Sequence, residues 1–257
     1  MTGGGSLTVV GTGIESTTQL SVGARAAIRA ADVSFFQVAD PVSALRVRSL
    51  CSNARSLAPY FSDEKPRGET YREICAVVTG EVAAGKRVCL VMYGHPGFYG
   101  TAAHEVVRRV RALGLPARML PAVSALDCLF ADLGLDPAKG GLQVYEASVF
   151  LENRPRVDVA ATLVLLQAGI LGEHGNTPTP AVLERYRALL GVLAETFGPD
   201  REAVLYEAAE YPGAHPLVVR FPLGTDDPPA PELRSTLCVP ASILRRARQR
   251  ADFTSSL

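Results

Sequence analysis

The sequence predicts an α/β protein of two domains, with a mostly parallel sheet in the N-terminal half and a mixed sheet in the C-terminal half. In the first half, apolar strand-like runs alternate with helical stretches, the order that gives a parallel sheet covered on both faces. In the second half, the last three strand-like runs follow one another with few helices between them, which favours antiparallel neighbours. No long linker separates the halves, so we expect domains 1–120 and 121–257 around a shared cleft.

Turn and cap residues delimit the expected elements. The apolar run at 7–13 ends in glycine, and Thr17 or Thr18 is expected to cap an alanine-rich helix that ends near residue 30. Further strands are expected at 32–38, 87–92 and 117–122, and helices at 67–84 and 102–113. After Pro121 we expect helices at 124–133 and 179–197, and strands at 142–147, 161–168, 203–209, 217–223 and 235–240.

The composition excludes several classes of protein. Of the 257 residues, 47% are hydrophobic and 20% are charged, which suffices for the core of one large or two small domains. Basic and acidic residues balance at 26 each, without long runs, so neither nucleic acid nor an anionic membrane is expected as a partner. No apolar run reaches the roughly 20 residues of a membrane span, and no signal peptide is recognised, so we expect a cytoplasmic protein. Cysteine and histidine spacings favour reduced core thiols and no metal site.

The stretch VMYGHPGFYG, residues 91–100, is the most informative segment. A buried-looking strand breaks there at a glycine- and proline-rich turn that carries Tyr93 and His95. Ligands of open α/β sheets bind beyond the carboxyl ends of the strands, where glycine permits close approach and proline fixes the loop. The segment therefore predicts a binding site, with an ordinary strand-to-helix turn as the alternative.

The Gly11-Thr12-Gly13 turn after the first strand is only weak support for a dinucleotide site. A third glycine is missing, and no acidic residue clearly ends the second strand. Asp40 precedes a proline, which is more typical of a turn and a helix cap than of a ribose ligand.

Two polar residues are expected on the inner face of the helix at 67–84. Arg67 and Tyr71 are four positions apart, and their face continues through the apolar residues Ile74 and Val78. Both side chains are therefore expected to point inward as a candidate site. The alternative is that both reach the rim of the sheet.

Two further positions suggest ligand contacts. Ser124 is expected to cap a helix whose amide end suits a polar or anionic group. Gln167 ends an apolar strand where a core residue is expected, so its amide meets either a ligand or backbone groups.

Five motifs together carry a family resemblance: LTVVGTGIES, the Tyr-Gly-His-Pro-Gly loop, RMLPAVSALDCLFADLGLDP, TLVLLQAG and STLCVP. They resemble the tetrapyrrole-methylase superfamily of S-adenosylmethionine (SAM) methyltransferases, and most closely the borosin peptide backbone α-N-methyltransferases. The resemblance runs from about residue 7 to residue 240. The Gly-His-Pro-Gly turn stands where ordinary tetrapyrrole methylases carry Gly-Asp-Pro, so His95 and Tyr93 favour the peptide branch.

The resemblance implies a two-domain tetrapyrrole-methylase-like fold with SAM in the interdomain cleft, and a homodimer that would offer sites for two precursors. Arg67 and Tyr71 match the family's catalytic Arg-x-x-x-Tyr pair, with Tyr71 as base and Arg67 stabilising the phenolate or the amide oxygen. Tyr93 and Tyr60 also fall among the active-site tyrosines, although the number of phenols in use stays open. The implied cofactor-binding residues are Tyr93, His95, Phe98, Ser124, Ala125, Gln167, Ala208, Ser235 and Thr236.

In the fused borosin enzymes, a clasp domain and a substrate tail follow the methyltransferase. Here the sequence ends with ARQRADFTSSL shortly after the last expected strand, so the resemblance implies the split type, which methylates a separate precursor peptide. The alternatives are a tetrapyrrole (precorrin-like) C-methyltransferase and a catalytically inactive SAM- or peptide-binding module.

Overall fold

The structure is a computed structural model that describes residues 4–62, 65–172 and 180–241. Within these residues, the first compact unit comprises the chain up to Cys128 together with Ala208–His215. The second comprises Leu129–Glu207 together with the chain from Pro216. The division into domains 1–120 and 121–257 stays a prediction.

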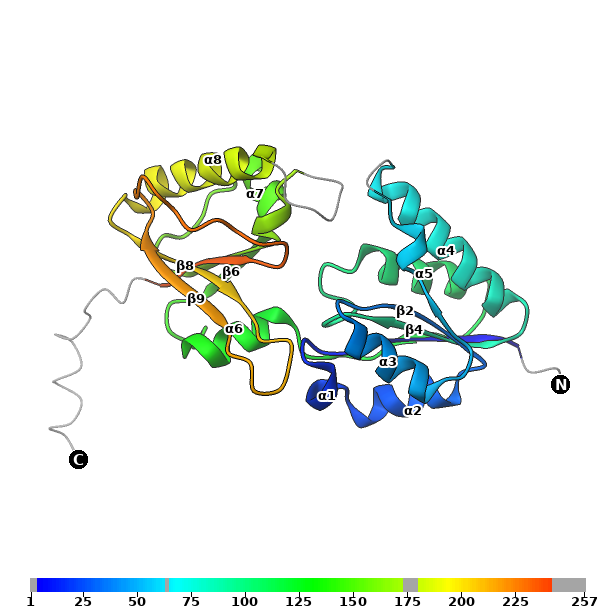
Figure 1. Cartoon of the computed structure of the whole chain (residues 1–257). Helices are drawn as coiled ribbons and strands as arrows, with labels where there is room; N and C mark the ends of the chain where they lie inside the picture. The colour runs from blue at the N-terminus through cyan, green and yellow to red at the C-terminus, as the bar shows by residue number, and fades with distance from the viewer. Residues whose placement is uncertain (1–3, 63–64, 173–179, 242–257) are drawn as a thin grey trace, which may run out of the picture. The chain divides into compact units, whose positions relative to one another are not determined.

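The first unit contains a parallel five-stranded sheet in the order β3-β2-β4-β1-β5. Helices α4 and α5 cover one face, and α1, α2 and α3 cover the other, as Figure 1 shows. The parallel sheet predicted for the N-terminal half is therefore confirmed. The strands are β1 (Ser6–Gly11), β2 (Val33–Gln37), β3 (Ala54–Ser56), β4 (Arg87–Met92) and β5 (Ala117–Met119). The helices are α1 (Ser16–Gln19), α2 (Val22–Ala30), α3 (Pro41–Leu50), α4 (Arg67–Ala83) and α5 (Thr101–Ala112).

Strand alternation divides the core of this unit between the two faces of the sheet. In β4, Val88 and Leu90 pack with the residues of α4 and α5, whereas Cys89 and Val91 pack with those of α2 and α3. Because both faces are covered, the central strands are apolar at nearly every position, as parallel strands usually are.

The caps of two helices differ in how well the sequence indicates them. Thr17 and Thr18 are not the cap expected for the alanine-rich helix, because the chain first forms the short α1 and then turns. Ser21 caps α2 instead, and its hydroxyl accepts a hydrogen bond from the Ala24 amide at 3.1 Å. Asp40 caps α3 and accepts a hydrogen bond from the Ser43 amide at 2.9 Å, which confirms its expected role.

The second unit contains a mixed five-stranded sheet in the order β6-β7-β10-β8-β9. β6 and β7 are parallel, and the other pairs are antiparallel, so the predicted mixed sheet is confirmed. Helices α7 and α8 cover one face (Figure 1). The strands are β6 (Leu142–Glu146), β7 (Thr162–Leu166), β8 (Glu202–Glu207), β9 (Leu217–Pro222) and β10 (Thr236–Val239), and the helices are α7 (Ala147–Asn153) and α8 (Pro180–Phe197). Helix α6 (Ala125–Leu133) begins in the first unit and ends in the second.

The cysteines are free thiols. Four are buried, and Cys128 is half-buried. Burial raises the pKa of the Cys89 and Cys238 thiols to about 12, as expected for core residues. None of the helices within the described residues has the length and apolarity that a membrane span requires.

Candidate ligand-binding site

Two glycine loops meet at the carboxyl edge of the parallel sheet in the first unit. The Gly94 amide donates to the Gly13 carbonyl at 3.0 Å, and the Gly13 amide donates to the Gly94 carbonyl at 3.3 Å. A Cβ atom on Gly11 would lie only 2.0 Å from the Gly94 oxygen. The loops after β1 and β4 are thus joined by backbone hydrogen bonds between glycines, which have no side chains to separate them. This contact accounts for the Gly11-Thr12-Gly13 motif without a dinucleotide.

The loop after β4 holds His95 in one tautomer. The Gly97 amide donates to His95 Nδ1 at 3.0 Å, so Nδ1 is an acceptor and Nε2 carries the proton of the neutral ring. His104 Nε2 lies 2.9 Å from the Gly97 carbonyl oxygen, and the Phe98 amide donates to the His95 carbonyl at 3.1 Å. Tyr93, His95 and Phe98 are all half-buried, so the loop is fixed while these three side chains keep exposed faces.

The Tyr93 hydroxyl donates to Glu210 Oε1 at 3.1 Å. Glu210 belongs to the segment Ala208–His215, which joins the first unit after the chain has passed through the second. Sequence reasoning selected Ala208 from this segment and missed Glu210. Glu210, an acidic residue two positions after Ala208, could have been chosen as a candidate. However, the neighbouring sequence does not indicate that it reaches Tyr93 at the end of β4.

Ser124 forms a reciprocal cap with Asp127 at the start of α6. The Ser124 hydroxyl accepts from the Asp127 amide at 3.3 Å, while the Asp127 carboxylate accepts from the Ser124 amide at 2.7 Å and from its hydroxyl at 2.6 Å. The predicted cap is confirmed. The hydroxyl is engaged with Asp127, so this segment offers a ligand the first helical turn beginning at Ala125 rather than a free hydroxyl.

The segment before α6 also lies against the two glycine loops. The position of a Gly11 Cβ would be 2.7 Å from Ala122 Cβ and 2.8 Å from Pro96 Cδ. The structure therefore brings the Tyr93–Phe98 loop and the segment leading to Ser124 together at the end of β1.

The catalytic pair expected on α4 is not as deeply placed as predicted. Thr70, Ile74 and Val78 form the buried row of the helix, whereas Arg67 and Tyr71 are half-buried beside it. Both positions share the helix face of Ile74, Cys75 and Val78, so the inward orientation stays a prediction.

Tyr60 is attached to the start of the same helix. It ends the short helix η1 (Ala58–Tyr60), and its carbonyl accepts a hydrogen bond from the Thr70 hydroxyl at 3.1 Å. Its ring packs on the same apolar cluster as Met92, the residue that precedes Tyr93. Tyr60 is thus connected both to α4 and to the end of β4.

The predicted residues of the second unit gather at one edge of its sheet. β7 and β8 both run antiparallel to β10, so their carboxyl ends meet the amino end of β10. Gln167 follows β7 in a left-handed conformation (φ 61°, ψ 35°), and the next amide, of Ala168, donates to the Ser235 carbonyl at 3.0 Å. Ser235 and Thr236 are buried.

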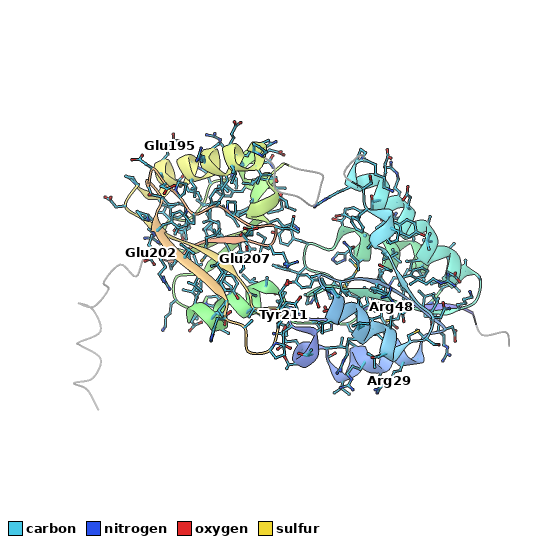
Figure 2. The ribbon with its side chains drawn as sticks, viewed as in Figure 1. Arg29, Arg48, Glu195, Glu202, Glu207 and Tyr211 are labelled. Atoms are coloured by element: carbon cyan, nitrogen blue, oxygen red, sulfur yellow. The ribbon has the colours of Figure 1, made fainter. Side chains whose placement is uncertain are left out.

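The Ser235 hydroxyl donates to Glu207 Oε1 at 2.5 Å, and Glu207 ends β8 (Figure 2). Glu207 is a polar residue of this edge that sequence reasoning missed. The candidate residues therefore form two sets, one in each unit.

The chain belongs to the Tetrapyrrole (Corrin/Porphyrin) Methylases, whose family model matches residues 6–225. This match confirms the family resemblance that the motifs indicated.

The relatives within this family are named as enzymes fused to peptide precursors. The chain is 38% identical over 220 residues to a methyltransferase/ribosomally synthesized cyclic peptide dendrothelin A precursor from Dendrothele bispora, covering 86% of this chain and 53% of that protein. It is 37% identical over 223 residues to a type I borosin cyclic peptide precursor from Coprinopsis marcescibilis, covering 86% and 57%. The omphalotin A precursor from Omphalotus olearius is 37% identical over 217 residues, covering 84% and 52%. The chain spans about half the length of these curated relatives.

Solved structures share the fold. A uroporphyrin-III-C-methyltransferase from Thermus thermophilus superposes with a TM-score of 0.62 at 21% identity, covering 94% of this chain and 93% of that one. A diphthine synthase gives 0.59 at 18% identity, covering 92% and 90%. These neighbours confirm the predicted α/β fold class.

Proposed function

We propose that the chain is a SAM-dependent methyltransferase that methylates backbone amide nitrogens of a peptide. The names of the relatives, which pair a methyltransferase with a cyclic peptide precursor, support both the activity and the peptide substrate. The observation that carries the proposal is the fixed Tyr93–Phe98 loop at the carboxyl edge of the parallel sheet, where such folds bind their ligands.

The residues present fit SAM. The half-buried rings of Tyr93 and Phe98 suit a sulfonium cation, which is attracted to aromatic faces. The first turn of α6 suits the carboxylate of the amino-acid part. Gln167 presents an amide that both donates and accepts hydrogen bonds, and its side chain forms none within the described residues.

When bound, SAM supplies an activated methyl group. The protein must overcome the weak nucleophilicity of the amide nitrogen, whose lone pair is delocalised into the carbonyl. In our proposal the Tyr71 hydroxyl oxygen, as phenolate, takes the N–H proton, and the Arg67 guanidinium stabilises the negative charge on the amide oxygen. Arg67 and Tyr71 are separated by about one helical turn, so one peptide unit is able to meet both.

Tyr60 and Tyr93 are proposed to hold the peptide in line with the methyl group, because correct orientation supplies much of the rate of a methyl transfer. The hydrogen bond from Tyr93 to Glu210 fixes the direction of the Tyr93 phenol. The enzyme is proposed to work as a homodimer. Sedimentation or light scattering at several concentrations tests this, and a monomer at all of them would contradict it.

The 257-residue chain is proposed to accept its peptide as a separate molecule. Calorimetry with SAM and its demethylated product tests cofactor binding, and lack of binding at millimolar concentration would sink the proposal. Incubation with SAM and a short peptide encoded beside the gene, followed by tandem mass spectrometry, tests the reaction. Methyl groups on backbone nitrogens support it. Methylation of the carbon skeleton of a tetrapyrrole instead would favour the alternative activity.

A further inference from the structure

The carboxylate of Glu207 is held in a defined place at the edge of the second unit's sheet. Its Oε1 atom accepts a hydrogen bond of 2.5 Å from the Ser235 hydroxyl, and Glu207 itself is half-buried. Figure 2 labels Glu207 and Glu202, which stand at the two ends of β8. These two glutamates provide a natural comparison.

The Ser235 hydroxyl is already fully engaged within the protein. Ser235 is 0% exposed, donates to Glu207, and accepts from the Glu232 amide at 2.8 Å. Its backbone amide donates to the Glu232 carbonyl at 3.0 Å. A buried hydroxyl with its proton committed does not donate to a ligand. The hydrogen bond from Ser235 instead fixes the orientation of the Glu207 carboxylate.

Glu207 differs from Glu202, at the other end of the same strand, in having no ion pair within the described residues. Glu202 forms an ion pair of 2.7 Å with Arg220. Across the described parts of the chain, neither Lys nor Arg forms an ion pair with Glu207. A half-buried carboxylate that receives one neutral hydrogen bond is incompletely compensated, since burial removes water from a charged group. Further hydrogen-bond donors are therefore expected from outside the protein.

We propose that Glu207 binds a hydrogen-bond donor group of SAM and that Ser235 positions it for this contact. The inference rests on the proposed function. SAM has three kinds of donor: the α-ammonium group, the ribose hydroxyls and the adenine amine. A carboxylate accepts from each of them. Gln167 lies at the same edge, because the amide that follows it is bonded to the Ser235 carbonyl.

The test is calorimetric titration with S-adenosylhomocysteine, the stable demethylated product. Glu207→Gln keeps the shape of the side chain and an acceptor for Ser235, but removes the charge. It is expected to weaken binding about 10- to 100-fold, as loss of a charge-assisted hydrogen bond does. The matched control, Glu202→Gln, lies on the same strand with an exposed side chain, and should bind like the wild type.

Two analogues identify the donor. If Glu207→Gln and the wild type bind 5′-methylthioadenosine, which lacks the amino-acid part, with equal affinity, the donor is the α-ammonium. If they bind S-inosylhomocysteine, which lacks the adenine amine, with equal affinity, that amine is the donor. Weaker binding of both ligands by Glu207→Gln assigns the contact to the ribose hydroxyls.

A double-mutant cycle tests the positioning role of Ser235. Ser235→Ala should weaken binding in the wild type but add nothing in the Glu207→Gln background, because its effect passes through the carboxylate. Equal losses in both backgrounds would mean that Ser235 acts only by supporting the fold. Thermal unfolding verifies that each variant is folded. If Glu207→Gln does not fold, Glu207→Asp, which withdraws the carboxylate by one methylene, replaces it with the same expected loss.

Wild-type affinity of Glu207→Gln and Glu207→Asp for S-adenosylhomocysteine would overturn this inference while leaving the proposed function intact. If the wild-type protein itself fails to bind, the proposed function fails and the inference with it. The two failures are thus distinguished by the wild-type titration.

Discussion

At the scale of single residues, the proposed catalytic roles of Arg67 and Tyr71 are separable from the proposed binding of the cofactor. Both side chains are half-buried on α4, whereas Ile74 and Val78 farther along the helix are buried. Replacing them therefore removes chemistry more than packing. This makes them suitable for a direct test of the proposed reaction.

Tyr71→Phe and Arg67→Ala are expected to lower peptide methylation at least 100-fold, because each removes a group that acts on the amide in the transition state. The dissociation constant for SAM should change less than about threefold in both variants. Arg72→Ala is the matched control, since Arg72 is exposed on the same helix and pairs only with Glu69, 3.6 Å away, among the described ion pairs. Mass spectrometry measures turnover. Near-normal turnover of Tyr71→Phe would refute the assignment of the base.

Local sequence patterns identified the residues whose role depends on their neighbours in the chain. Ser124 and Asp40 were recognised as caps because the partner amide lies three residues away. Glu207 and Glu210 were missed, because their partners Ser235 and Tyr93 are far away in sequence. Contacts of that kind follow from strand order, which spacing alone does not give.

At the scale of secondary-structure elements, the central strands were predictable and the short elements were not. β4 and β7 contain continuous apolar runs, β1 is largely apolar, and the buried faces of α5 and α8 repeat with helical period. β3 and α7 span only 3 and 7 residues and carry little periodicity. α3 was missed because its apolar residues do not gather on one face.

Two glycines with different surroundings predict opposite effects of substitution by alanine. Gly11→Ala should destabilise the protein by about 2 kcal/mol or more, because its Cβ would collide with backbone and with Ala122. Gly80→Ala, at an exposed position in the last turn of α4 with nothing within 4 Å of the new Cβ, should stabilise it by about 0.5–1 kcal/mol. Urea denaturation measures both. A harmless Gly11→Ala would show that the loops are not held together as described.

An ion pair between the starts of β2 and β4 predicts acid sensitivity. Hydrogen bonds from Arg87 hold the pKa of Asp32 at about 2, below its ordinary value of 3.8. Since the folded-state pKa is the lower one, this pair stabilises the fold above about pH 4, and the contribution is lost as the pH falls toward 2. Asp32→Asn should lower the melting temperature slightly at pH 6 and leave it unchanged at pH 2. The exposed position limits the effect. An equal decrease at both values would contradict the ion-pair origin.

At the scale of the whole molecule, the proposed separate substrate has a direct test. Purified enzyme incubated with SAM alone should keep its intact mass, while added peptide should gain about 14 Da per methyl group, one transfer at a time. The segment ARQRADFTSSL, on which the split-type interpretation drew, lies outside the described residues. Methyl groups on residues 251–257 of the enzyme would overturn the proposal of a separate substrate.

The left-handed backbone of Gln167 opposes stability to the proposed binding of SAM at a single residue. A non-glycine residue in this conformation costs on the order of 1 kcal/mol, which glycine would not incur. Selection for heat resistance alone would therefore favour glycine here, while selection for a bound ligand would retain the amide. In a library of variants at position 167, sorting for stability should raise the frequency of glycine. A second round of sorting for SAM binding should then remove glycine.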